Sequence, residues 1–151
     1  MGDVERAERI TRKRARMVTV LAIIFIATQA IYFGKAAKFD TWGDVRTVDA
    51  VHISAWLVMA IALLALLMTG GGWFQSPQVR ALVDDESTRE HRQKALSVGF
   101  IAAMLTCAGL YFATMFEPIS GREAVHLTMT IGIGAALLSF GAQERMALKD
   151  G

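Results

Sequence analysis

The sequence predicts an all-α fold: an integral membrane four-helix bundle, built from two duplicated transmembrane hairpins. Three observations support this prediction. The 151 residues are 54% hydrophobic and only 20% charged, whereas soluble chains are roughly 45–50% apolar by a similar count. Four long apolar runs, over residues 17–33, 51–69, 95–116 and 124–141, contain no Asp, Glu, Lys or Arg. A short motif near the start of the second run recurs near the start of the fourth.

The first predicted elements are a basic cytoplasmic arm over residues 1–16 and a span over residues 17–34. The arm holds six Lys and Arg residues. A helix needs roughly 20 apolar residues to cross the hydrocarbon of a bilayer, and this apolar run approaches that length. The run is also longer than the roughly 7–15 apolar residues of a cleaved signal peptide. We therefore expect the first helix to be retained.

The other elements follow from the remaining runs and from helix-start signals between them. They are a span over 45–69, a cytoplasmic loop over 70–87, spans over 88–116 and 121–143, and a cytoplasmic tail over 147–151. Ser87 with Glu90, and Ser120 with Glu123, match the capping box that opens a helix. Glu90 and Lys94 are also spaced for an ion pair along one helix face. The four spans together form a single domain over 17–146.

The distribution of basic residues predicts the orientation in the membrane. Twelve of the 16 Lys and Arg residues lie on the side of the arm, the middle loop and the tail, and four lie on the other side. Because basic loops stay in the cytoplasm, we expect a multi-pass protein of a bacterial-type inner membrane with both termini cytoplasmic. The net charge of +2 is too small to indicate a nucleic-acid partner.

The recurring motif predicts that one hairpin has been duplicated. Residues 49–54 (DAVHIS) align with residues 123–128 (EAVHLT), and all six pairs are identical or conservative. Each hairpin begins and ends on the cytoplasmic side, so the two halves have the same topology. Halves of this kind are related by an axis along the membrane normal.

Small residues form the predicted packing faces of the bundle, because close backbone approach drives helix association in lipid. On the fourth span these residues are Thr128, Gly132, Ala136, Ala135 and Ser139. The second span carries Ala55, Ala62 and Ala65. We expect these two faces to meet near the axis of the bundle, or to serve a second protomer.

His52 and His126 are the candidate cofactor-binding residues, because the repeat places them at equivalent positions on two helices. Histidines on facing helices of a bundle can hold a b-type haem, or a transition metal. Asp49 and Glu123 lie one turn away, where each carboxylate could orient a ring. The alternative is that both histidines have a structural role at the membrane interface. No C-x-x-C-H motif is present, which excludes covalent haem attachment.

These patterns favour a non-enzymatic protein with no cofactor and no metal. We expect an accessory or assembly subunit of a larger membrane complex, or a homo-oligomer, whose other contacts are membrane lipids. The first alternative is an electron-transfer protein that binds haem through His52 and His126. The second is a small-molecule transporter that works as a dimer, although proton-coupled transport normally requires a charge inside the membrane. The polar residues within the spans, such as Gln29 and Thr106, are more typical of helix packing.

Overall fold

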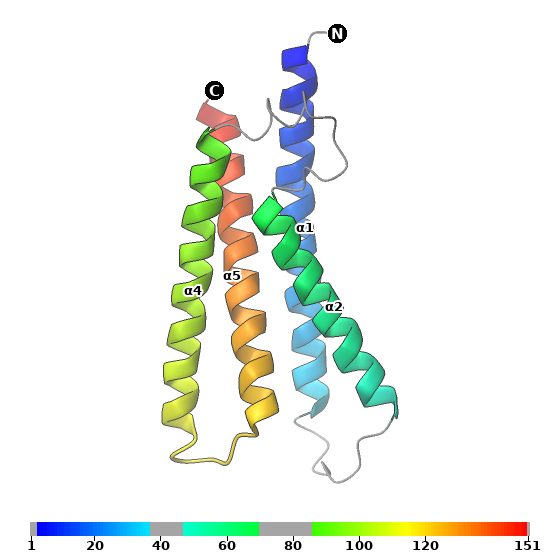
Figure 1. Cartoon of the computed structure of the whole chain (residues 1–151), viewed down its shortest axis with the longest axis vertical. Helices are drawn as coiled ribbons and strands as arrows, with labels where there is room; N and C mark the ends of the chain where they lie inside the picture. Colours follow the sequence, from blue (N-terminus) through cyan, green and yellow to red (C-terminus); the bar gives the residue numbers. More distant parts are fainter. Residues whose placement is uncertain (1–2, 37–46, 70–85, 151) are drawn as a thin grey trace.

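The computed structural model describes residues 3–36, 47–69 and 86–150. All regular secondary structure in this part of the chain is helical, which confirms the predicted all-α class. The helices are α1 (Asp3–Ala36), α2 (Thr47–Thr69), α4 (Glu86–Ala113) and α5 (Gly121–Asp150). Figure 1 shows that they alternate in direction and that the two termini lie at the same end of the molecule.

Two helices are longer than the predicted spans. The basic arm is a direct continuation of α1, which begins at Asp3. The predicted tail belongs to α5, which runs to Asp150. Residues 3–16 and 144–150, which form these extensions, contain neither Pro nor Gly. Nothing in their composition therefore strongly opposes a helix.

The second predicted capping box is confirmed. Ser120 N–H donates to Glu123 Oε2 at 3.1 Å, and Glu123 N–H donates back to Ser120 Oγ at 3.2 Å. α4 is described from Glu86 and so already includes Ser87, and the first capping box stays a prediction. Glu90 pairs with Lys94 as their spacing predicts, with Lys94 Nζ 2.7 Å from Glu90 Oε1.

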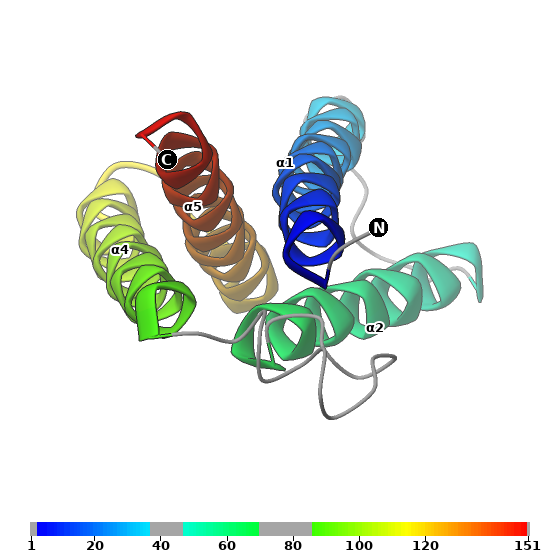
Figure 2. The same cartoon turned by 90° about the horizontal axis from the view of Figure 1, so that it is seen from above.

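α5 is the central helix of the bundle, with α4 and α1 packed along it. Seen from above in Figure 2, α4, α5 and α1 follow one another in a row, and α2 runs across one side of that row. α2 touches α5 only locally, and it diverges from α1 toward one end (Figure 1). The two hairpins therefore pack differently, because α4 follows α5 closely whereas α2 does not follow α1. The duplication itself stays a prediction.

The core lies where single stripes of three helices meet. Buried positions are spaced alternately by three and four residues, which keeps them on one face of each helix. The stripes are Ala15, Val18, Ala22, Phe25 and Gln29 on α1; Trp56, Ala60, Leu63 and Leu67 on α2; and His126, Thr130, Ile133, Leu137, Phe140 and Glu144 on α5. The α5 stripe is polar at both ends and apolar between them.

A different face of α5, made of small residues, packs against α4. A Cβ on Gly132 would lie 3.1 Å from the Cβ of Ala103, and Cys107 Sγ lies 3.6 Å from Thr128 Oγ1. The predicted small face of the fourth span thus meets α4 through Thr128, Gly132 and Ala136, and not the small face of the second span. The short connection between α4 and α5 places them side by side, which explains this difference.

Two helical segments, Glu86–Ala113 and Gly121–Ala147, are long and apolar enough to cross a membrane. The apolar segments found in the described parts of the other two helices are shorter, at Ala15–Ile31 and Ile53–Thr69. The molecule also exposes large hydrophobic side chains. They include Ile23 and Ile24 on α1, Val58 and Ile61 on α2, Phe100 and Leu105 on α4, and Ile131 and Leu138 on α5.

Candidate functional site

His126 lies at the point where α1, α2 and α5 come together. Its side chain is only 6% exposed. The imidazole stacks on the indole of Trp56 from α2, with ring centroids 4.1 Å apart and an angle of 14° between the rings. An aromatic pair in this geometry stabilises the contact beyond the area it buries, so α2 is attached to α5 through a specific ring contact.

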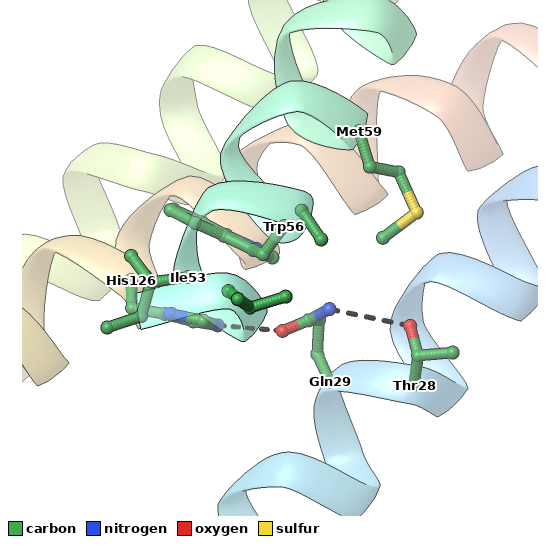
Figure 3. A pocket seen from close by; sticks show the side chains of 8 residues that line it. Thr28, Gln29, Ile53, Trp56, Met59 and His126 are labelled. Carbon is green, nitrogen blue, oxygen red and sulfur yellow. Dashed lines mark hydrogen bonds between the residues drawn. The ribbon is translucent and has the colours of Figure 1, made fainter. Parts of the chain in front are cut away.

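A chain of hydrogen bonds links His126 to α1. His126 Nε2 donates to Gln29 Oε1 at 2.7 Å, because an amide oxygen can only accept. The Gln29 amide nitrogen donates in turn to Thr28 Oγ1 at 3.4 Å. Thr28 Oγ1 donates to the backbone oxygen of Phe25 at 2.8 Å. Figure 3 shows Gln29 reaching from α1 toward the stacked rings of His126 and Trp56.

These residues border a pocket of about 220 Å³ between the same three helices. α1 and α5 supply its polar lining, and α2 supplies most of its apolar lining (Figure 3). The lining residues are Thr28, Gln29, Val51, Ile53, Ala55, Trp56, Met59 and His126. None of these described lining residues carries a charged side chain. The Gln29 amide is part of the polar lining.

The structure describes only part of the predicted histidine site. The side chains of His52 and Asp49 lie outside the described residues, so the pairing of His52 with His126 stays a prediction. Glu123 accepts hydrogen bonds from Ser120 at the start of α5. His126 itself is turned toward Gln29 and Trp56. A haem iron that used His126 Nε2 would have to displace the Gln29 amide from that nitrogen.

The other two predicted packing residues of α5, Ala135 and Ser139, are half-buried. Ser139 Oγ accepts a hydrogen bond from Gln143 at 3.0 Å. On α2, Ala55 and Ala62 are exposed and Ala65 is half-buried. The small face of α2 is therefore only partly used within this chain.

A second polar contact lies at the end of the bundle where the termini gather. His91 Nδ1 on α4 donates to Glu144 Oε1 on α5 at 3.4 Å, and the Glu144 side chain is 2% exposed. Thr88 is buried one turn away on α4. In the described part of the chain, no group of three or more His, Cys, Asp or Glu residues is arranged to hold a metal ion.

The sequence did not reveal the partners of His126. Gln29 interrupts an apolar run, which marks it as a polar residue within a helix face, but 97 residues separate it from His126. Trp56 has the hydrophobic character of the residues around it. Comparisons of the chain with protein-family models, with curated proteins and with solved structures found no match.

Proposed function

We propose that the chain is a multi-pass protein of a bacterial-type inner membrane, with four spans and both termini in the cytoplasm. Two segments long and apolar enough to cross a membrane support this proposal. The large hydrophobic side chains exposed on each of the four described helices support it as well, because extensive exposed apolar surface is unfavourable in water. The common end of the two termini (Figure 1) agrees with an even number of spans.

Cysteine labelling tests this placement. In a Cys107→Ser background, Gly121→Cys and Gly151→Cys each provide one thiol, placed before and after the fourth span. An impermeant maleimide added to intact spheroplasts is expected to label Gly121→Cys and to label Gly151→Cys only after lysis. The reverse pattern would overturn the orientation, and labelling of both thiols in intact cells would overturn the fourth span.

Within the membrane, we propose that the protein is non-enzymatic and works by assembling with other membrane chains. A second copy of this chain is the first candidate partner, and a subunit of a larger complex is the other. The observation that carries this proposal is the exposure of Ala55 and Ala62. They are seven residues apart, which places them on one face of α2. In lipid, such small residues allow another helix to approach closely.

The packing of α2 adds to this argument. Within the chain, α5 uses its small residues Gly132 and Ala136 against α4, and α4 and α1 extend along α5. α2 has only a local contact with α5, so much of its surface faces away from the bundle (Figure 2). A helix from another chain could pack there without rearranging the core.

Disulfide cross-linking tests the proposal directly. In the Cys107→Ser background, Ala62→Cys places a thiol on the proposed face, and Leu105→Cys places one on the exposed face of α4. Oxidation in membranes is expected to give a disulfide-linked dimer with Ala62→Cys and not with Leu105→Cys. If neither variant cross-links and light scattering in detergent gives the mass of one copy, assembly with a second copy is excluded. A different membrane chain that co-purifies in fixed ratio would then identify the accessory-subunit form.

The two alternative functions have less support. Electron transfer through a haem between His52 and His126 would have to break the hydrogen bond from His126 to Gln29. A dimeric transporter that exchanges protons would need an ionisable group inside the membrane, and the four apolar runs contain no Asp, Glu, Lys or Arg.

A further inference from the structure

The pocket beside Gln29 is large enough to hold a small ring compound. Its volume is about 220 Å³, and a cavity of about 150 Å³ is known to accept benzene. The apolar part of the lining comes mainly from α2, through Val51, Ile53 and Met59. A six-membered ring with small substituents would fit this space, and an attached chain would leave toward the lipid beside α2.

Two side chains at the pocket, Gln29 and Trp56, have hydrogen-bond donors without a partner among the described residues. A carboxamide has two N–H donors, and the described contacts of Gln29 use one of them, in a long bond to Thr28. The indole of Trp56 also lines the pocket, and its Nε1 is buried without a hydrogen-bond partner in the described part of the chain. An unpaired buried donor is unfavourable, and the hydrocarbon of a bilayer has no water to satisfy it. A ligand for this pocket should therefore present an acceptor oxygen.

The lining also restricts the charge of the ligand. None of the described residues that line the pocket is Asp, Glu, Lys or Arg, so an ionic ligand would lose its hydration with no opposite charge among them to compensate. We infer that the pocket binds a neutral, lipid-soluble ring compound with a carbonyl oxygen and an apolar tail, of which a tailed quinone is the matching chemistry. The carbonyl would accept from the Gln29 amide. This inference concerns binding alone. It rests on the proposed membrane placement and not on assembly through α2.

Fluorescence of Trp56 tests the inference. With Trp42→Phe and Trp73→Phe, Trp56 becomes the only tryptophan of the full chain. A benzoquinone with a decyl tail, titrated into the purified protein in detergent, is expected to quench this fluorescence in a saturable way. Thr28→Phe should abolish the saturable component by filling the pocket from α1, away from the proposed assembly face of α2, whereas Ala108→Phe, on the exposed face of α4, should leave it unchanged. Gln29→Leu should weaken binding about tenfold.

Competition distinguishes a ring carbonyl from the ester carbonyl of a lipid. Decylbenzene has the same tail without carbonyls and should not displace the quinone, and methyl decanoate should displace it only weakly. Quenching without saturation, or equal binding to the Thr28→Phe and Ala108→Phe proteins, would overturn the site. Equal displacement by methyl decanoate would overturn the preference for a ring. Flotation of the protein with liposomes is measured separately, so a wrong membrane placement is recognised independently of ligand binding.

Discussion

A Cβ atom on Gly99 would lie 2.7 Å from the backbone oxygen of Gly132. The same Cβ would also lie 2.7 Å from the Cβ of Ala136. The backbones of α4 and α5 therefore approach each other so closely at this point that even a methyl group at position 99 would overlap α5. Because this contact is backbone against backbone, a side chain cannot relieve it by changing rotamer.

Gly99→Ala is therefore expected to destabilise the protein by about 1–3 kcal/mol, the usual result of adding atoms to a packed contact. Gly109→Ala is the matched control on the same helix, because a Cβ there would meet nothing within 4 Å. The midpoint of thermal unfolding in detergent, followed by circular dichroism, should fall for Gly99→Ala only. Equal midpoints for the two variants would mean that α4 and α5 do not approach closely at Gly99.

Gly141 makes a similar contact with α1. A Cβ at this position would overlap Thr19 Oγ1, whose hydroxyl donates to the backbone oxygen of Ala15 at 2.8 Å. Gly141→Ala should lower the unfolding midpoint. Adding Thr19→Ala removes the overlapping hydroxyl and should restore most of the loss, since the Thr19 Cβ would lie at an ordinary distance of 3.5 Å. A double variant as unstable as Gly141→Ala alone would contradict this account.

The bond from His126 to Gln29 predicts a coupling free energy between the two residues. Gln29→Leu leaves the buried His126 Nε2 without this acceptor, at an expected cost of roughly 1–3 kcal/mol. His126→Phe keeps an aromatic ring against Trp56 and removes the donor. The double variant should be less destabilised than the sum of the single variants. A double-mutant cycle from unfolding in detergent measures this difference, and strict additivity would argue against the bond.

A visible spectrum tests the haem alternative. Protein expressed with ample haem is expected to have no b-type absorption in a reduced-minus-oxidised spectrum, because Gln29 occupies His126 Nε2. If a b-type spectrum is seen and is lost in both His52→Ala and His126→Ala, the two histidines are axial ligands and the electron-transfer function replaces the one proposed. Loss in neither variant would assign the absorption to another site.

The helices themselves could be predicted well from hydropathy, because each contains one long apolar run. The span predicted over 45–69 corresponds to α2 at Thr47–Thr69, and the fourth span begins at 121 as predicted. The extensions of α1 and α5 were outside the reach of hydropathy, because a charged helix in water has no apolar signal. The two capping patterns look alike in sequence, and the one at Ser120 caps α5.

The neighbours of each helix were harder to predict than the helices. The spacing of Thr128, Gly132 and Ala136 identifies a packing face, but it does not say which helix covers that face. Likewise, the repeat singles out His126 in the sequence, whereas its burial and its contacts with Gln29 and Trp56 depend on how α1 and α2 lie against α5. Local patterns report the face of a helix, and tertiary contacts between distant residues decide its partner.

The continuous length of α1 has a mechanical consequence. Its 34 residues make a rod of about 51 Å at 1.5 Å per residue, while the hydrocarbon of a bilayer is about 30 Å thick. In the proposed membrane placement, the end that carries the exposed side chains of Arg9, Arg12 and Lys13 would therefore extend into the aqueous phase as a rigid helix. A partner that bound this end and rotated it about the helix axis would rotate the whole of α1, including Gln29 in the pocket lining.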